Sequence, residues 1–158
     1  MDFVLVSQLW RYPVKSLRGA ALDTARLTLD GGSGDRVVHV AGHDIRRLRP
    51  NIVLSGMAAD LEPDLPGQAL AIGDALIGVH SVRQRCVVTT IDPATGEQDL
   101  NVLRRIRDVF GGEVALDCWV IRPGTVHVGD TVRFEAPPRE PDRIGGWIVG
   151  APYPHATR

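Results

Sequence analysis

Cys86 is one of two cysteines in the chain and lies in the stretch QRCVVTTIDPATGEQDL, between an arginine and a run of β-branched residues. Arg83 and Arg85 flank it, and positive charges that point toward the sulfur favour the thiolate, the form that binds soft metals or attacks electrophiles. The alternation of RCVVTT could equally turn Cys86 inward as a small apolar residue. Packing and chemistry are both open for Cys86, whereas Cys118, inside EVALDCWVI, is predicted to be a core residue.

Four stretches, including the cysteine stretch, carry hydrogen-bond donors on or beside predicted loops. They are YPVKSLRG at 12–19, GGSGDR at 31–36, RPN at 49–51 and RQRC at 83–86. Backbone N–H groups in such loops and the forked guanidinium of arginine can hold phosphate or another oxyanion. If the fold brings these stretches together, they form an anion site built from Lys15, Arg36, Arg49 and Arg85. Each arginine taken alone could instead be a solvated surface residue or the partner of a nearby carboxylate.

Several other functional classes find no support in the sequence. The five histidines have no paired spacing such as H-E-x-x-H, and no G-x-S-x-G elbow is present. The two cysteines lack the C-x-x-C spacing of zinc sites and are too few for a disulfide scaffold. A formal net charge of -1 gives no general attraction to nucleic acid or acidic membranes, so an anion site must be local.

Length and composition predict one globular domain over residues 1–158. A chain of 158 residues can bury one sizeable core, and its 44% hydrophobic and 23% charged residues are ordinary for a globular protein. The first residues lack a basic region and a long apolar run, so they are expected to be mature structure rather than a signal peptide. No segment approaches the length of a membrane span, and a reducing cytoplasm is the expected compartment.

The dominant pattern along the chain is that of β-strands. Short β-rich runs alternate with Gly, Pro and Asp, and predict strands at 3–10, 22–29, 36–40, 52–55, 75–82, 86–90, 114–121 and 131–135. A Gly-Asp dipeptide at 73–74 and another at 129–130 each separate two such runs, as tight turns often do. The sequence therefore predicts a mainly β fold, a mostly antiparallel sheet closed into a barrel, with one or a few short helices.

One segment has helical periodicity. In LNVLRRIRDVF, residues 100–110, Leu103, Ile106 and Phe110 fall on one face, and two glycines follow. The spacing predicts a short amphipathic helix, capped near Asp99 or Asn101.

The connecting segments carry three further predictions. Pro50 disfavours helical geometry at Arg49 and predicts extended backbone there. Residues 58–68 are expected to form a surface loop. Residues 136–158 are expected to be a C-terminal tail that wraps the domain or frays.

Taken in order, the four stretches resemble the MOSC family, the molybdenum cofactor sulfurase C-terminal domains, and within it the amidoxime-reducing component branch. LWRYPVKSLRG resembles the family's opening strand and lysine-serine turn, GDR its following arginine, and RPNIVLSG its arginine-asparagine stretch. RCVVTTIDPATGE with the downstream LNVLRRIR resembles its cysteine motif and helix. The resemblance spans residues 4–135.

The resemblance implies a MOSC-like β-barrel that binds a molybdenum cofactor (Mo-molybdopterin). Cys86 matches the catalytic thiolate that ligates molybdenum, while the pterin dithiolene supplies the other sulfurs. The positions that match residues holding the pterin and its phosphate are Lys15, Ser16, Arg36, Arg49, Asn51 and Arg85. A phosphate dianion suits arginine and lysine, and a soft thiolate suits a sulfur-rich metal centre.

The implied function is an oxidoreductase that reduces N-hydroxylated or N-oxide small molecules with electrons from a separate electron-transfer protein. The chain has no motif for flavin, haem or iron–sulfur binding, and neither nucleic acid nor a membrane is an expected partner. Two-part relatives carry a long insertion between the DR and RPN stretches, where this chain has only VVHVAGHDIRRL. The alternatives are a carrier of cofactor or persulfide sulfur on Cys86, without reductase activity, and a binding module whose arginines serve another anion.

Overall fold

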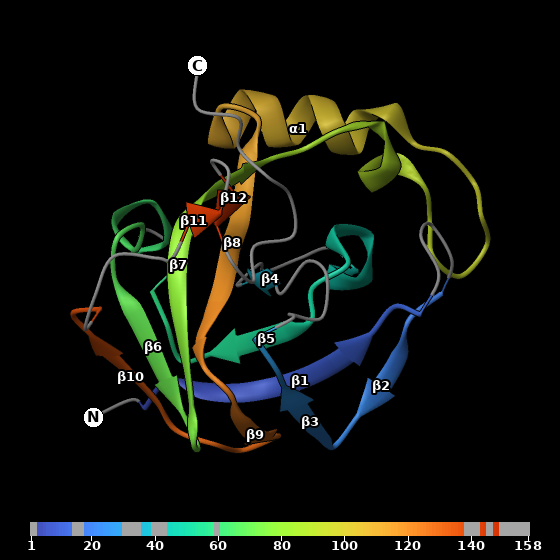
Figure 1. Ribbon diagram of the computed structural model, residues 1–158. Helices are drawn as coiled ribbons and strands as arrows, with labels where there is room; N and C mark the ends of the chain where they lie inside the picture. The colour runs from blue at the N-terminus through green and yellow to red at the C-terminus, as the bar shows by residue number, and fades with distance from the viewer. Residues whose placement is uncertain are drawn as a thin grey trace.

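The computed structural model describes residues 3–13, 18–29, 36–38, 44–58, 61–137, 143–144 and 147–148, with the backbone alone at 36–38, 143–144 and 147–148. The strands are β1 (Leu5–Arg11), β2 (Ala20–Leu22), β3 (Thr24–Leu27), β4 (Arg36–Val38), β5 (Ile52–Ser55), β6 (Ala69–Ile72), β7 (Ala75–Gln84), β8 (Glu113–Arg122), β9 (Gly124–His127), β10 (Val132–Glu135), β11 (Arg143–Ile144) and β12 (Trp147–Ile148). The helix α1 (Leu100–Phe110) and the 3₁₀ helices η1 (Ile45–Leu48), η2 (Glu62–Asp64) and η3 (Val87–Thr90) complete the described elements. The described chain is therefore mainly β with one α-helix, as predicted (Figure 1).

The large sheet has eight strands in the order β10-β6-β7-β8-β4-β5-β1-β2. Its neighbours are antiparallel except for β4 and β5, which run parallel. β7 and β8 are ten residues each and pair from Leu76 with Arg122 to Gln84 with Glu113. Both η3 and α1 lie in the connection between these two strands (Figure 1). The cysteine stretch therefore leaves the sheet at the C-terminal end of β7, and the chain returns at the start of β8.

The sheet curls so that its edge strand β10 approaches β1. Three backbone hydrogen bonds of 2.8–2.9 Å join residues 4–6 to residues 129–132. Apart from these bonds, the two segments are joined by one isolated β-bridge, between Leu5 and Thr131, and they do not pair as continuous strands. Within the described ranges no sheet is closed on itself, so the predicted closure into a barrel is not confirmed. Two small pairs, β3 with β9 and β11 with β12, stand apart from the large sheet.

Aliphatic side chains of the strands form the main core. The largest fully buried ones are Leu9, Ile52, Leu54, Leu70, Ile72, Ile77 and Leu116. A smaller cluster, made by Leu48, Ile106, Val114 and Ala115, packs η1 and α1 against the start of β8. Burial of large aliphatic side chains of this kind is favourable by about 1.5–3 kcal/mol each. The second cluster therefore holds η1 and α1, the two helices next to the cysteine stretch, against the sheet.

Most predicted strands are confirmed with shifted ends. The strand predicted at 52–55 is β5 unchanged, and those at 3–10, 75–82, 114–121 and 131–135 correspond to β1, β7, β8 and β10. The run 22–29 contains the end of β2 and all of β3, and β6 and β9 were not found from the sequence. The dipeptide at 73–74 is a hairpin turn between β6 and β7, whereas the one at 129–130 joins strands of two different sheets.

The strand predicted at 86–90 is wrong, because the chain forms the 3₁₀ helix η3 there. The hydroxyl of Thr89 donates to Cys86 O (2.8 Å) and that of Thr90 to Val87 O (2.6 Å). β-Branched composition favours a strand, but these side chains bond to the backbone three residues earlier and stabilise a turn instead.

The extended backbone predicted at Arg49 is also wrong. Arg49 has φ 52° and ψ 53°, in the left-handed region, and ends η1 with its N–H donating to Arg46 O (3.0 Å). Pro50 excludes right-handed helical geometry at the preceding residue, and the chain meets that restriction with a left-handed rather than an extended residue.

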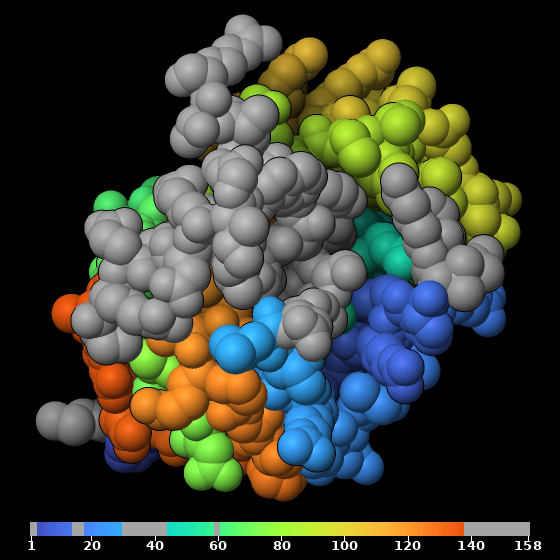
Figure 2. Space-filling model, in the orientation of Figure 1, coloured from blue at the N-terminus to red at the C-terminus, as the bar shows by residue number. Residues whose placement is uncertain are grey.

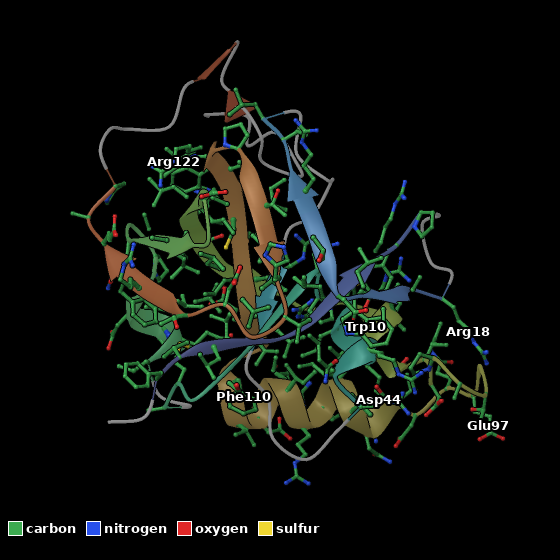
Figure 3. All side chains as sticks on the ribbon, turned by 90° about the horizontal axis from the view of Figure 1, so that it is seen from below. Trp10, Arg18, Asp44, Glu97, Phe110 and Arg122 are labelled. Carbon is green, nitrogen blue, oxygen red and sulfur yellow. The ribbon has the colours of Figure 1, made fainter. Side chains whose placement is uncertain are left out.

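The helix α1 begins and ends as predicted. Asp99 is its N-cap and accepts the Asn101 N–H at 2.9 Å, and Gly111 ends it with φ 66°. Ile106 is the buried residue of the helix, whereas Phe110, predicted on the same face, is exposed at the last turn (Figure 3). The middle of α1 packs on the sheet and its C-terminal turn extends beyond that contact.

The predicted surface loop at 58–68 contributes to the core where it is described. Leu65 is buried in the main core, and the buried Glu62 accepts the Ala115 N–H at 3.2 Å. Ala115 has φ 72° and lies where the register between β7 and β8 shifts. Glu62 therefore supports a β-bulge next to the end of β7. Of the predicted tail, residues 143–144 and 147–148 form β11 and β12, and residues 138–142, 145–146 and 149–158 lie outside the described residues.

We expect Gly78→Ala to destabilise the protein. Gly78 lies opposite the buried Trp119, and an added Cβ would be 2.2 Å from the indole ring. Overpacking of a core costs about 1–3 kcal/mol, so the melting temperature should fall by several degrees. In the double variant Gly78→Ala/Trp119→Leu, the loss should be smaller than the sum of the two single losses. A wild-type melting temperature for Gly78→Ala would contradict this packing.

Candidate functional site

Cys86 is exposed at the point where the chain leaves β7 and enters η3. Just before it, the Arg85 N–H donates to Gly112 O (2.9 Å) and holds the end of β7 to the start of β8. The carbonyl of Cys86 then accepts the Thr89 N–H (3.1 Å) in addition to the Thr89 hydroxyl. The backbone on both sides of Cys86 is thus fixed while the residue stays exposed, which favours chemistry over packing. Cys118 is buried in the main core, as predicted.

Arg85 joins the cysteine stretch to two other parts of the chain. Its Nε donates to Val114 O (2.7 Å) and its Nη1 to Leu48 O (3.3 Å). Leu48 directly precedes Arg49, so Arg85 brings the RQRC and RPN stretches side by side. These contacts give Arg85 a structural role, and its predicted contact with a cofactor stays a prediction.

Arg83 forms an ion pair within the sheet. Its Nη1 lies 2.6 Å from Oδ1 of Asp117, and both side chains are largely buried. In the sheet register Asp117 also lies opposite Arg36 of β4. The charge of Arg83 is therefore balanced by a carboxylate of β8, and the backbone of Arg36 lies on the other side of β8 from β7.

Arg49 stacks on Tyr12. Its Cζ lies 4.3 Å from the centroid of the Tyr12 ring, which is a cation–π arrangement. Gly19 lies on Tyr12 as well, since an added Cβ there would be 2.5 Å from the ring. The cation–π contact holds the guanidinium of Arg49 over the Tyr12 ring.

Asn51 ties the RPN stretch to the end of β1. Its Nδ2 donates to Trp10 O (3.1 Å), and its own carbonyl accepts the Trp10 N–H (2.8 Å). The Nδ2 contact uses one of the two hydrogens of the Asn51 side-chain amide, and the predicted pterin contact of Asn51 stays a prediction.

The side chains of three predicted site residues cannot be compared with the structure. Lys15 and Ser16 lie outside the described residues, and only the backbone of Arg36 is described. The segment 14–17 nevertheless has described neighbours on both sides, Tyr12 before it and Arg18 and Gly19 after it. The contact between Tyr12 and Gly19 brings these flanks together beside Arg49.

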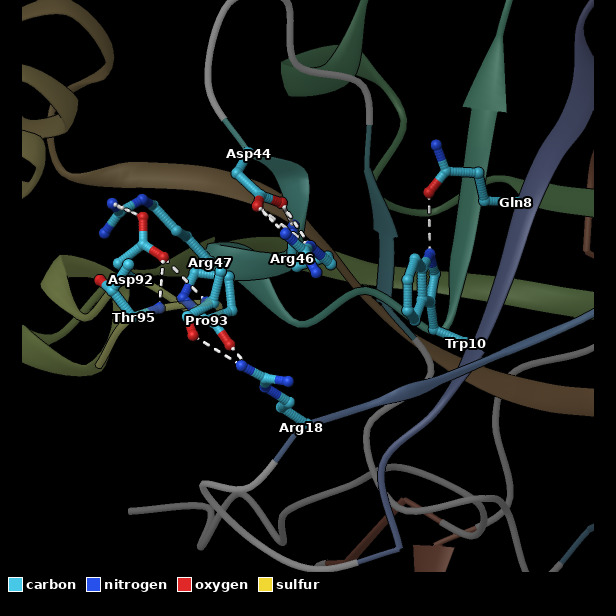
Figure 4. Close-up of polar contacts among 10 residues, drawn as sticks. Gln8, Trp10, Arg18, Asp44, Arg46, Arg47, Asp92, Pro93 and Thr95 are labelled. Carbon is cyan, nitrogen blue, oxygen red and sulfur yellow. Dashed lines mark hydrogen bonds and ion pairs between the residues drawn. The ribbon is translucent and has the colours of Figure 1, made fainter. Parts of the chain in front are cut away.

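Two arginines that the sequence analysis missed hold the loop after η3. Arg47 donates from Nη1 to Thr90 O (3.0 Å) and from Nη2 to Asp92 Oδ2 (2.7 Å). Arg18 donates from Nε to Pro93 O (3.1 Å) and from Nη2 to Ala94 O (2.6 Å). Figure 4 shows both arginines converging on this loop, and Figure 3 places Arg18 beside the loop that carries Glu97. We call these two residues the Arg18–Arg47 clamp. No sequence motif marks it, because the accepting groups are mainly backbone carbonyls.

Asp92 is the acidic partner of the clamp. Its Oδ1 accepts the N–H groups of Ala94 (2.8 Å) and Thr95 (3.1 Å), as in an Asx turn. These two bonds, with a smaller contribution from Arg47, hold the pKa of Asp92 below its ordinary value of 3.8.

Arg46, next in sequence to Arg47, serves a different partner. Its Nε lies 2.9 Å from Oδ1 of Asp44, the N-cap of η1. This contact lowers the pKa of Asp44 from its ordinary value. The pair is confined to η1 (Figure 4), so Arg46 is a matched reference for Arg47.

No three His, Cys, Asp or Glu side chains gather as a metal-binding group in the described part of the chain. In the same part, no helix is long and apolar enough to span a bilayer.

A family model described as MOSC domain matches residues 24–133. The protein Mitochondrial amidoxime-reducing component 1 is 33% identical over 101 residues in Homo sapiens and 34% identical over 101 residues in Mus musculus. Each alignment covers 53% of this chain and 28% of the relative, so the chain spans little more than a quarter of the length of the curated relatives it matches. The crystal structure of the YUAD protein from Bacillus subtilis is similar with a TM-score of 0.63 and 17% identity, over 84% of this chain and 96% of that chain. This last likeness concerns the fold.

We expect the contribution of Asp92 to stability to disappear at low pH. Because folding lowers its pKa below 3.8, the contribution is fully present above that pH and is lost as the pH falls through the folded value. Asp92→Asn cannot ionise, so the melting temperature of the wild type should exceed that of the variant at pH 7. The difference in melting temperature between the two proteins should shrink below pH 3.8. The titration of Asp44 does not affect this difference, because both proteins contain Asp44. A difference that is constant between pH 7 and pH 2 would contradict an ionic role for Asp92.

Proposed function

The chain belongs to the MOSC domain family, whose model covers residues 24–133, and from this premise we propose that it binds a molybdenum cofactor with Cys86 as the protein ligand of the metal. The observation that carries the proposal is the exposed Cys86 on a turn that is held by bonds from Arg85 to β8 and η1 and by a bond from Arg47 of η1 to Thr90 O. A ligand thiol has to be accessible and held in place, and Cys86 is both.

The donor set of the described residues fits such a cofactor. A thiolate is a suitable ligand for a soft metal, and a cofactor that brings its own dithiolene sulfurs needs only one thiolate from the protein. This agrees with a single exposed cysteine and with no cluster of three protein ligands in the described ranges. An anionic phosphate on the cofactor requires forked cationic donors, and Arg49 lies within the stretch that Arg85 holds beside Cys86.

The residues that would hold the pterin and its phosphate are those inferred from the sequence. Among them, Arg49 has the most structural support, because its guanidinium is held over the Tyr12 ring and its neighbour Leu48 is bonded to Arg85 of the cysteine stretch. Arg85 and Asn51 would act mainly by positioning the stretches, through bonds to Leu48 O and Trp10 O. Lys15, Ser16 and Arg36 stay in the proposal on the resemblance and on the placement of their flanking residues.

We further propose that the bound cofactor serves a reductase of N-hydroxylated or N-oxide small molecules. When bound, the cofactor supplies a redox-active metal that can accept an oxygen atom from the substrate. The protein contributes the thiolate, fixes its backbone and leaves one side open for substrate. The resemblance to the amidoxime-reducing component branch implies that a separate electron-transfer protein would supply the electrons.

A second candidate is a carrier of cofactor or of persulfide sulfur. The exposure of Cys86 supports it, since a transferable sulfur must meet the thiol of another protein. Intact-mass measurement for one added sulfur on Cys86, beside an assay with a benzamidoxime-type substrate and a chemical reductant, separates the two. Turnover without added sulfur supports the reductase, and added sulfur without turnover supports the carrier.

We expect Cys86→Ser to lose bound molybdenum while keeping the fold. The change is nearly isosteric at an exposed position, but a hydroxyl is a poor ligand for a soft metal. The measurement is the molybdenum-to-protein ratio after expression in a host that makes the cofactor, with the melting temperature as a check on folding. Cys118→Ala is the matched control, because it removes the buried thiol and should leave the ratio unchanged. A wild-type ratio in Cys86→Ser would remove Cys86 as the ligand.

We expect Arg49→Gly to weaken cofactor binding with little change in the stability of the fold. The left-handed backbone at Arg49 costs an ordinary residue about 1–2 kcal/mol and costs glycine almost nothing, while the lost cation–π contact is worth about 0.5–1 kcal/mol. The free energy of unfolding should therefore change by less than about 1 kcal/mol. Cofactor occupancy should fall about tenfold or more, as for loss of a charge-assisted contact. Arg46→Ala, which removes a locally paired arginine, is the control, and equal occupancy in both variants would remove Arg49 from the site.

A further inference from the structure

The helix η3 has its polar and apolar residues on unexpected sides. Its two threonines are buried, with 4% of Thr89 and 0% of Thr90 exposed. Its two valines are exposed, with 51% of Val87 and 37% of Val88 accessible to solvent. Hydrophobic burial alone would favour the opposite arrangement.

The hydrogen bonds of the threonines explain how this arrangement is held. Besides the bonds of both hydroxyls to the preceding carbonyls, the Thr90 hydroxyl accepts from Nε2 of Gln98 (3.1 Å). Arg47 satisfies the Thr90 carbonyl. The buried hydroxyls of Thr89 and Thr90 are therefore hydrogen-bonded, so their burial costs little. With the threonines turned inward, the two valines of η3 are left exposed.

The apolar surface continues beyond η3. The Ile91 N–H donates to Val88 O (3.3 Å), and the Asp99 N–H donates to Thr90 O (2.8 Å), which places Leu100 next to the turn. Ile91 and Leu100 are both exposed large apolar residues. We call Val87, Val88, Ile91 and Leu100 the apolar platform. Figure 2 shows the segment that carries it at the surface of the molecule, below α1.

The size and position of the apolar platform indicate what covers it. Four partly exposed side chains offer a few hundred Å² at most, whereas a stable protein interface takes about 800 Å² from each partner. Val87 follows the exposed Cys86 directly, so a molecule whose reacting end lies at Cys86 extends over the platform. A small molecule with an apolar body fits both the area and this continuity.

We propose that the apolar platform binds the apolar body of the substrate whose reacting end is held at Cys86 or at a group bound to it. The proposal rests on the proposed function in taking Cys86 as the reactive position. It adds the substrate class: uncharged molecules with an aromatic or aliphatic body are selected over polar ones of the same reactivity.

The test uses three maleimides that share one electrophile and differ in the attached group: N-phenylmaleimide, N-methylmaleimide and N-(2-hydroxyethyl)maleimide. Cys86 is the exposed one of the two cysteines, and Cys86→Ser measures the background from the buried Cys118. Rates are divided by those of N-acetylcysteine, which removes the intrinsic reactivity of each reagent. We expect the phenyl reagent to be favoured over the other two about five- to tenfold, with saturation at high concentration, as for burial of an aromatic ring on apolar surface.

The variant Val87→Thr/Val88→Thr keeps the shape and branching of both residues and replaces one methyl of each by a hydroxyl. It should reduce the preference for the phenyl reagent to less than about twofold while the rate with N-methylmaleimide stays as in the wild type. Val128→Thr, at an exposed valine in the turn between β9 and β10, is the matched control and should keep the full preference.

A wild-type preference equal to that of N-acetylcysteine would overturn the proposal, and so would a preference that survives Val87→Thr/Val88→Thr. The assay uses cofactor-free protein, in which the Cys86 thiol is available, and molybdenum is measured separately on protein from a host that makes the cofactor. Molybdenum bound in the second preparation, without a phenyl preference in the first, rejects the apolar platform alone. A phenyl preference in the first preparation, without molybdenum in the second, supports the platform and rejects cofactor binding.

Discussion

The backbone carbonyls around Cys86 need hydrogen-bond donors that no neighbouring strand supplies, and arginine side chains supply them. Arg85 serves Val114 and Leu48, Arg47 serves Thr90, and Arg18 serves Pro93 and Ala94. Each arginine comes from a different part of the chain, so each bond also joins two segments. An unpaired carbonyl costs about 1–3 kcal/mol where it is buried, so the part-buried bonds of Arg85 and Arg47 stabilise a turn outside the sheet, whereas the bonds of Arg18 lie in an exposed loop.

Three arginines around the cysteine turn use a geometry that lysine lacks. The chain has 18 lysines and arginines, and Lys15 is the only lysine among them. Arg18, Arg47 and Arg85 each bond two acceptors at once from different nitrogens. The planar fork of a guanidinium suits such a bridge, whereas an ammonium group acts as a flexible point charge. Arg85, which the sequence predicts as an anion donor, therefore also holds together the segments around Cys86.

Prediction from the sequence worked where a local pattern is sufficient and failed where a partner distant in sequence decides. The periodicity and caps of α1, the β-rich runs and the buried Cys118 each follow from short-range rules. The strand expected at 86–90 failed because threonine hydroxyls bonding the backbone compete with strand pairing. The Arg18–Arg47 clamp could not be found at all, since its acceptors are peptide carbonyls that every residue type carries.

The short connection between the GDR and RPN stretches has a structural role of its own. The resemblance to two-part relatives places a long insertion there, and this chain instead has a connection whose described end is η1. Arg47 and Leu48 of η1 both bond the segment from Arg85 to Asp92, and Leu48 packs with Ile106 of α1. The connection thus braces the cysteine turn from one side, where the relatives build a larger structure. Because these bonds hold η3 without burying its valines or the neighbouring Cys86, the valines and the thiol are exposed together, which is the arrangement that a site open to small molecules requires.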